Sequence, residues 1–101
     1  MKRFAAFALF FASTLCAADP ANLMTESRIR FMAANCAYCH GPGGKSRGAI
    51  PSLAGMDRKY FVDRMKAFRD GTRPNTVMGS HASGYTDAEI IALGDWFSTH
   101  K

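Results

Sequence analysis

The residues with the clearest chemistry are Cys36, Cys39 and His40, which stand in the run Cys-Ala-Tyr-Cys-His. Two thiols at this spacing can each form a thioether with one vinyl group of a porphyrin, and the adjacent His40 then serves as the proximal iron ligand. The pattern therefore predicts one covalently attached haem c with its iron. A thioredoxin-like dithiol would need a βαβ pattern, and a zinc site would need a second Cys or Cys/His pair. The sequence shows neither, so both alternatives, and a chance cluster, are disfavoured.

The second axial position of the iron can take a methionine, a histidine or no residue, and this choice separates electron transfer from ligand binding or catalysis. Met78 lies well inside an irregular stretch between the last two expected helices, far enough along the chain to reach the distal side. His81, three residues further on, is the rival ligand. Because a thioether is a soft, neutral donor that favours reduced iron, Met78 suits an electron carrier of high potential.

The proximal side can also be supported from the loop that follows the haem motif. Residues Ile50 to Gly55 read Ile-Pro-Ser-Leu-Ala-Gly, which is apolar enough for the segment to be buried against a porphyrin. A carbonyl near Pro51 could then accept the Nδ1 proton of His40, which would fix the ring and raise its basicity as a ligand. A plain surface turn is the alternative interpretation of this segment.

Residues 1–18 have the anatomy of a secretory signal peptide. A basic start is followed by an apolar run to Leu15 and by small residues that end at Ala18. The run is too short to cross a bilayer comfortably, which takes about 20 residues. We therefore expect cleavage after Ala18, a periplasmic location, no stable membrane insertion and one domain over residues 19–101. A retained anchor or a lipid on Cys16 is disfavoured.

Size and charge narrow the possible functions. The chain has 101 residues, and a domain of this size has a marginal core that a cofactor can reinforce. Its formal net charge is +5, but Lys2 and Arg3 would leave with the signal peptide. The carboxylates of a haem would bring the remaining charge nearer to zero. We therefore expect no nucleic-acid partner.

Hydrophobic periodicity and capping residues predict three helices, over residues 23–35, 58–70 and from Thr86 nearly to the end of the chain. The first would carry Ile29, Met32 and Cys36 on one face, which would bring Cys36 to the haem edge. Asp57 and Gly71 delimit the second. No strand is predicted, so the fold class is all-α.

Two long loops are expected between these helices. Residues 41–55 and 72–84 are rich in turn-forming residues and lack a sustained period. Loops longer than about 12–15 residues are uncommon unless they bind something. A haem that fills the space between the helices would account for both loops.

Residues 23–101 resemble a class I cytochrome c, through Cys36 to His40, Ile50 to Gly55, Met78 and the helix that begins at Thr86. The resemblance implies three main helices and two long loops wrapped around one covalently attached haem.

The same resemblance implies roles for particular side chains. The carbonyl of Pro51 would support His40, and Leu53 would pack on the haem. The first and last helices would cross through the faces that carry Ile29 with Met32 and Leu93 with Phe97. The first helix lacks the glycine expected at this crossing.

More narrowly, residues 60–71, 76–79 and 84–87 are similar to the haem-bearing subunit of flavocytochrome c sulfide dehydrogenase. This resemblance implies an FAD-containing flavoprotein partner that oxidises sulfide and hands electrons to the haem. The chain would be an electron-transfer subunit, not catalytic alone, of the short single-haem form. A diffusible carrier to a terminal oxidase or another acceptor is the alternative. A haem enzyme or ligand sensor with an open iron site is disfavoured, because the sequence offers only His81, Tyr85 and nearby basic residues for such chemistry, with no paired carboxylates and no spare cysteine.

Electrons would leave through the porphyrin edge near the two cysteines. Small residues between Ala37 and Gly44 would permit close approach of a partner. Lys45 and Arg47 could guide an acidic partner to this edge, at a rate that falls with added salt.

Overall fold

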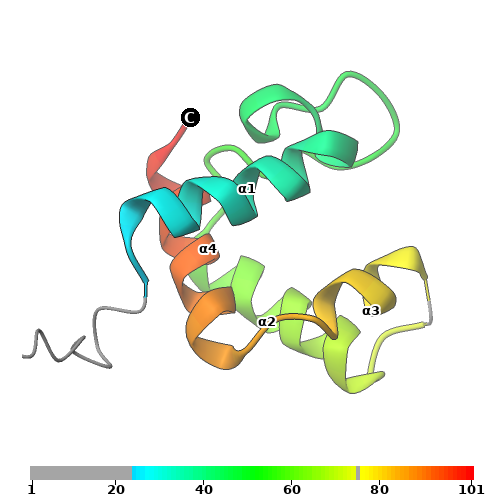
Figure 1. Ribbon diagram of the computed structural model, residues 1–101. Helices are drawn as coiled ribbons and strands as arrows, with labels where there is room; N and C mark the ends of the chain where they lie inside the picture. The colour runs from blue at the N-terminus through cyan, green and yellow to red at the C-terminus, as the bar shows by residue number, and fades with distance from the viewer. Residues whose placement is uncertain (1–23, 75) are drawn as a thin grey trace, which may run out of the picture.

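The computed structural model describes residues 24–74 and 76–101. Within them the chain forms α1 (Glu26–His40), a 3₁₀ turn η2 (Pro42–Gly44), α2 (Arg58–Asp70), α3 (Val77–Ala82) and α4 (Asp87–Thr99), and no strand. The predicted all-α fold class is confirmed. Figure 1 shows α1 and the loop after it in the upper part of the molecule, α2 and α3 in the lower part, and α4 between them.

The predicted signal peptide, residues 1–18, lies outside the described residues. Its cleavage and the domain boundary at residue 19 therefore stay predictions. Among the helices that the structure describes, none combines the length and the apolarity needed to span a bilayer.

Helix α1 ends later than the sequence predicts. The expected helix covered residues 23–35, whereas α1 spans Glu26–His40. Thr25 caps its start, because its Oγ1 accepts a hydrogen bond from the backbone N–H of Arg28 at 3.3 Å. No residue of the haem motif breaks a helix, and the first residue that does is Gly41, with a φ of 95°. The haem motif therefore occupies the last turns of α1.

Helices α2 and α4 begin and end close to the predicted positions, because their ends are set by local hydrogen bonds. The Asp57 carboxylate accepts a hydrogen bond from the N–H of Tyr60 at 2.9 Å, and Gly71 ends α2 in the left-handed conformation. At the start of α4, Thr86 and Glu89 exchange two side chain to backbone hydrogen bonds, each 3.2 Å long. The predicted capping box is confirmed.

The second long loop was predicted without regular structure, and this prediction is wrong. Residues Val77–Ala82 form the short helix α3. Thr76 caps it, since its Oγ1 accepts a hydrogen bond from the N–H of Met78 at 3.2 Å. A helix of this length has too few residues for an apolar period, and Gly79 and Ser80 are typical of turns.

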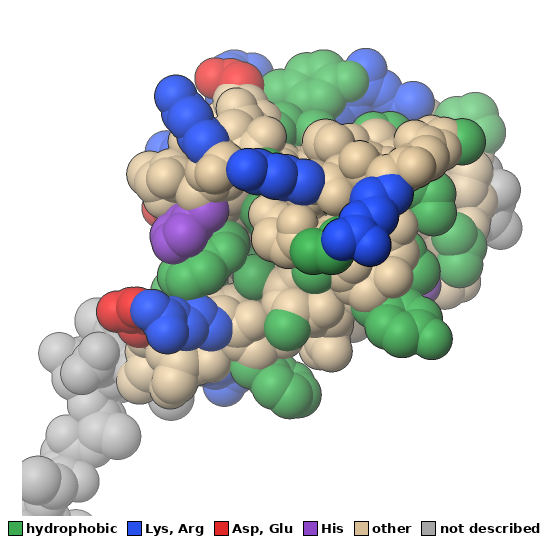
Figure 2. Space-filling model, turned by 90° about the horizontal axis from the view of Figure 1, so that it is seen from above, with side chains coloured by type: hydrophobic (Ala, Val, Ile, Leu, Met, Phe, Trp, Pro, Cys, Tyr) green, Lys and Arg blue, Asp and Glu red, His purple; other side chains and the backbone are tan. Residues whose placement is uncertain are grey.

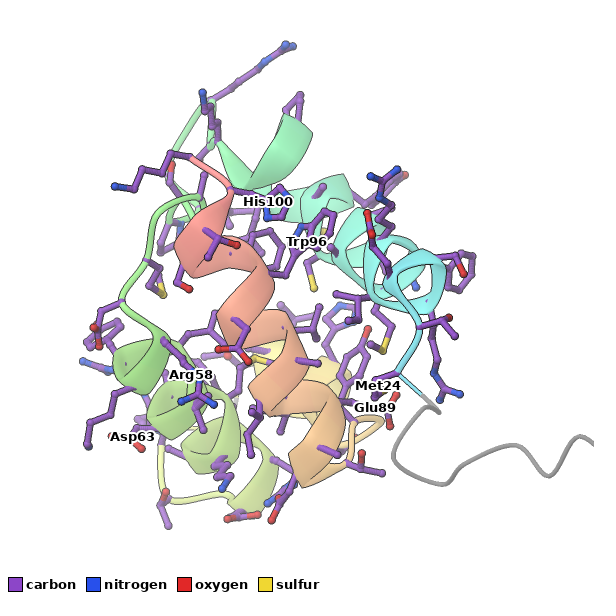
Figure 3. All side chains as sticks on the ribbon, turned by 90° about the vertical axis from the view of Figure 1, so that its left-hand side faces the viewer. Met24, Arg58, Asp63, Glu89, Trp96 and His100 are labelled. Atoms are coloured by element: carbon purple, nitrogen blue, oxygen red, sulfur yellow. The ribbon has the colours of Figure 1, made fainter. Side chains whose placement is uncertain are left out.

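The core lies where α4 packs between α1 and α2, an arrangement that Figure 3 shows with α4 at the centre. The rings of Phe61 and Phe97 meet here, with their centroids 5.8 Å apart. The buried apolar side chains come from all four helices and from the loop before α2: Met32, Ala33, Leu53, Phe61, Met65, Ala82, Ile90, Leu93 and Phe97.

The glycine that permits close helix packing lies on α4 rather than on α1. A Cβ at Gly94 would lie 3.0 Å from Cγ2 of Val62 and 3.4 Å from the carbonyl oxygen of Arg58, both on α2. Helix α1 contributes the small side chain of Ala33, which is buried in the same core. The close approach that needs a glycine is therefore the one between α2 and α4.

Candidate functional site

The two cysteines and the histidine of the haem motif share one face of α1, because positions i, i+3 and i+4 of a helix lie on the same side. Cys36 is half-buried, Cys39 is exposed and His40 is buried. All three line one pocket. The helix therefore presents two thiols and one imidazole to the same space.

A hydrogen bond selects the tautomer of the neutral His40 ring. Nδ1 of His40 lies 2.6 Å from the carbonyl oxygen of Pro51. Because a carbonyl oxygen can only accept, Nδ1 carries the proton and donates it. The other ring nitrogen, Nε2, is then left with a free lone pair for a metal. This is the contact that the sequence predicts for a carbonyl near Pro51.

The loop is held in place by Gly44. Its carbonyl oxygen accepts hydrogen bonds from the N–H groups of Leu53 at 2.7 Å and Ala54 at 3.1 Å. A Cβ at Gly44 would lie 2.8 Å from Cε1 of Phe97, so only glycine fits at this approach to α4 without displacing the ring. The contact between Gly44 and the core thus brings the Pro51 segment under His40.

The side chains of the segment 50–55 differ in how far the protein itself buries them. Leu53 is buried, but Ile50 is 45% exposed, and Pro51 and Ser52 are exposed too. In this segment the Leu53 side chain packs into the core, whereas Pro51 contributes its carbonyl oxygen. Burial of the other side chains of this segment against a porphyrin stays a prediction.

Both candidates for the second axial ligand lie on α3. Met78 and His81 line the same pocket as His40, and they are three residues apart on the helix. Met78 is half-buried and packs against the core, whereas His81 is exposed. The structure thus brings all the predicted iron ligands together, with Met78 the more enclosed of the two distal candidates.

This pocket adjoins a second one, and Leu53, Phe61, Met65 and Met78 line both. We call the joined space the cleft. Its cysteine end is also lined by Asn35, Cys36, Cys39, His40, His81 and Tyr85. Its arginine end is also lined by Pro51, Met56, Tyr60, Arg64, Phe68 and Arg73.

Several residues that line the cleft belong to no sequence motif, so the sequence did not identify them as part of the site. Phe61 and Met65 belong to the apolar side of α2, but periodicity alone cannot tell a core side chain from one that faces a cofactor. Arg64 and Arg73 showed no signal at all, because arginines of helices and loops are usually solvated. Their common position becomes visible only once α2 and the segment after it are folded together.

Burial raises the pKa of the Cys36 thiol to about 11. It also raises the pKa of the Tyr85 hydroxyl, and negative charge on Cys36 or Glu89 would act in the same direction. A redox dithiol needs the opposite, a thiol whose pKa is lowered so that it reacts at neutral pH. The Cys36 environment therefore suits a structural tether better than a catalytic thiol.

The donor atoms of the cleft fit a haem. Within residues 24–74 and 76–101, no group of three or more His, Cys, Asp or Glu side chains is placed to hold a metal ion. The cleft offers instead two thiols for a porphyrin edge, one oriented imidazole and one thioether from another helix. These are sufficient for a haem, since the ring nitrogens of the porphyrin complete the coordination of its iron.

Comparison with known proteins agrees with this chemistry. A family model described as cytochrome c matches residues 29–101. The cytochrome subunit of sulfide dehydrogenase from Chlorobaculum tepidum is 43% identical over 88 residues, which cover 86% of this chain and 80% of that protein. The thiosulfate dehydrogenase electron acceptor of Thiomonas intermedia is 39% identical over 68% of this chain, but the match spans only 33% of that protein. Cytochrome c4 of Azotobacter vinelandii is 30% identical over 68% of this chain and 38% of its own length.

Proposed function

The chain belongs to the cytochrome c family of electron carriers, and from this premise we propose that it carries single electrons in the periplasm through a haem iron bound by His40 and Met78. The haem c of this family is covalently bound, and its iron supplies the one-electron exchange. The observation that carries the proposal is the hydrogen bond from His40 to Pro51, 2.6 Å long, in a pocket that Met78 also lines.

Each predicted site residue has a distinct task in this proposal. Cys36 and Cys39 hold the porphyrin through thioethers, so the cofactor cannot dissociate. The Pro51 carbonyl orients His40 and makes it a stronger donor. Leu53 is buried and contributes an apolar wall to the cleft.

The apolar wall also influences the reduction potential. Leu53, Phe61 and Met65 are all buried and line both ends of the cleft. An apolar surrounding disfavours the extra positive charge of oxidised iron, as does a thioether ligand. Both effects stabilise the reduced form, which suits a carrier that accepts electrons readily.

We expect the electron donor to be a flavoprotein that contains FAD and oxidises sulfide. Support comes from the relative in Chlorobaculum tepidum, which is named as the cytochrome subunit of a sulfide dehydrogenase. The relative in Thiomonas intermedia is named as an electron acceptor, which agrees with the direction of transfer. Of the residues that the structure describes, no carboxylate lines the cleft, so these residues offer few groups there for acid-base catalysis.

The docking face would lie at the cysteine end. Lys45 and Arg47 are exposed there and make no ion pair among the described residues. Figure 2 shows the molecule from above, a view in which blue basic side chains are more prominent than red acidic ones. An acidic partner would be attracted to this face.

Two measurements on the protein from its native source test the proposal. Intact-protein mass spectrometry should give the mass of residues 19–101 plus one haem. A flavin spectrum that accompanies the haem through purification would identify a bound flavoprotein subunit. A chain that retains residues 1–18 or a lipid would contradict the soluble periplasmic assignment, and a haem protein that purifies alone would favour the diffusible carrier.

A further inference from the structure

The acidic side chains of the described residues all have partners. Glu26, Asp63, Asp70, Asp87, Glu89 and Asp95 each form an ion pair, and the remaining one, Asp57, caps α2. Figure 3 labels one member of such a pair, Arg58, whose partner Asp95 lies on α4. Within the same residues, the basic side chains left without a carboxylate are Lys45, Arg47, Arg64, Arg73 and Lys101.

Arg64 and Arg73 differ from the other unpaired basic residues. Lys45, Arg47 and Lys101 are exposed, whereas Arg64 and Arg73 are half-buried. Each of the two guanidinium groups lies over an aromatic ring, with 4.7 Å from Arg64 to the centroid of Tyr60 and 5.1 Å from Arg73 to that of Phe68. Packing on an aromatic face restricts where a long side chain can place its charge. The guanidinium group of each arginine is therefore restricted in position by its aromatic neighbour.

Both arginines lie at the arginine end of the cleft. Arg64 comes from α2 and Arg73 from the segment after it, and both line the same pocket. Among residues 24–74 and 76–101, the only other titratable side chain that lines it is Tyr60, and no Asp, Glu, His or Lys does so. Two positive charges beside an apolar wall cost free energy unless an anion compensates them. The pocket thus has the charge and the shape for an anionic group that is otherwise apolar.

A haem has such a group on the side opposite to its attachment. Its two carboxylate-bearing chains lie on the far side of the porphyrin from the carbons that form the thioethers. Cys36 and Cys39 line one end of the cleft, while Arg64 and Arg73 line the other. We propose that Arg64 and Arg73 bind the two haem carboxylates and keep them ionised throughout the physiological pH range. This inference rests on the proposed function, and it assigns the orientation of the haem in the cleft.

The reduction potential should then be insensitive to pH. A carboxylate beside a guanidinium has a pKa lowered by about 1–3 units, so it releases its proton well below neutral pH. Replacement of an arginine would raise that pKa toward the range in which the protein works. Protonation of the carboxylate removes a negative charge that stabilises oxidised iron, and the potential would therefore rise as the pH falls.

The test compares the haem-loaded variants Arg64→Gln, Arg73→Gln and the double variant with the wild type. NMR titration of the haem carboxyl groups gives their pKa values directly, and potentiometry from pH 4 to 8 gives the dependence of the potential. Arg58→Gln is the matched control, since Arg58 lies on α2 and is paired with Asp95. Arg64→Lys keeps the charge but loses the planar guanidinium that can bind a carboxylate through two N–H groups, so we expect a smaller rise of the carboxyl pKa values. We expect the carboxyl pKa values to rise by about 1–3 units in the Gln variants and to stay unchanged in the control.

Unchanged carboxyl pKa values in the double variant would overturn this inference. If the wild-type protein nevertheless carries covalent haem, the proposed function stands. A wild-type protein without covalent haem would overturn the proposed function and this inference together. If the Gln variants lose haem during maturation, Arg64→Lys and Arg73→Lys decide the matter, because a small rise in carboxyl pKa supports the inference and no change contradicts it.

Discussion

At the scale of single residues, the hydrogen bond from His40 to Pro51 is the contact with the largest chemical consequence. It leaves Nε2 free and fixes the plane of the ring before any ligand binds. On the distal side the structure offers two candidate iron ligands, because Met78 and His81 both line the cleft. Half-burial of Met78, against an exposed His81, favours the methionine.

Replacement of Met78 by alanine should therefore remove the sulfur-to-iron charge-transfer absorption of the oxidised protein. It should also lower the reduction potential, because a thioether favours reduced iron. His81→Ala is the matched control on the same helix and should leave both properties as they are. If His81→Ala abolishes the absorption while Met78→Ala does not, the ligand assignment is wrong.

The two cysteines should be required for a normal yield of holoprotein. Cys36→Ala or Cys39→Ala leaves at most one thioether, and a domain this small depends on its cofactor for stability. Haem content after acid and solvent extraction, and the spectrum of the pyridine adduct, measure the loss. Tyr38→Ala is the control, since Tyr38 lies between the cysteines and is 92% exposed. A Cys36→Ala/Cys39→Ala protein with stably bound haem at normal yield would contradict the attachment site.

At the scale of secondary structure, short local hydrogen bonds set the position of each element. The capping box of α4 is the clearest case, because it joins Thr86, Glu89 and, across the molecule, Arg28. The pKa of Glu89 is lowered chiefly by the hydrogen bond from the backbone N–H of Thr86, with a further contribution from Arg28. A carboxylate with a lowered pKa contributes stability above its unfolded pKa, and the protein loses that contribution as the pH falls through the folded pKa.

Glu89→Gln should accordingly reduce the free energy of unfolding at pH 7 by up to about 1 kcal/mol. The difference from wild type should shrink below about pH 4, where the carboxyl is protonated in the unfolded and then also in the folded chain. Denaturant unfolding of the haem-loaded protein at several pH values measures this. Thr86→Ala removes an uncharged cap, so its cost of about 1 kcal/mol should persist in acid. A Glu89→Gln effect that does not depend on pH would contradict the role of its charge.

At the scale of the whole molecule, four of the positive charges that lack a carboxylate partner among the described residues fall into two groups with different environments. Lys45 and Arg47 are exposed near the haem motif, whereas Arg64 and Arg73 are half-buried in the cleft. Exposed charges act at long range on a partner, and their effect falls with ionic strength. Half-buried charges act on a bound group and are screened much less. The first group therefore concerns docking and the second concerns the cofactor.

Charge reversal in the first group should slow reduction by an acidic flavoprotein. At low salt we expect Lys45→Glu/Arg47→Glu to lower the rate by roughly tenfold or more, with an unchanged haem spectrum and a difference that narrows as salt is added. Stopped-flow reduction across a salt series measures it. Lys59→Glu changes a surface charge on α2 and should have a smaller effect. Equal rates for the double variant and the wild type at every salt concentration would contradict docking at this face.

The sequence by itself determined the chemistry of attachment, the fold class and the ends of α2 and α4. These features are all short-range, so they can be recognised without knowledge of the fold. They are the spacing of the two cysteines, Asp57 and Gly71 at the ends of α2, and the capping box of α4. Only the tertiary structure placed the haem motif within a longer α1, made α3 a helix and buried Leu53 in the core. It alone brought Arg64 and Arg73 to one end of the cleft, because their meeting depends on how α2 and the following segment pack. Contacts between distant parts of the chain leave no local pattern for the sequence to reveal.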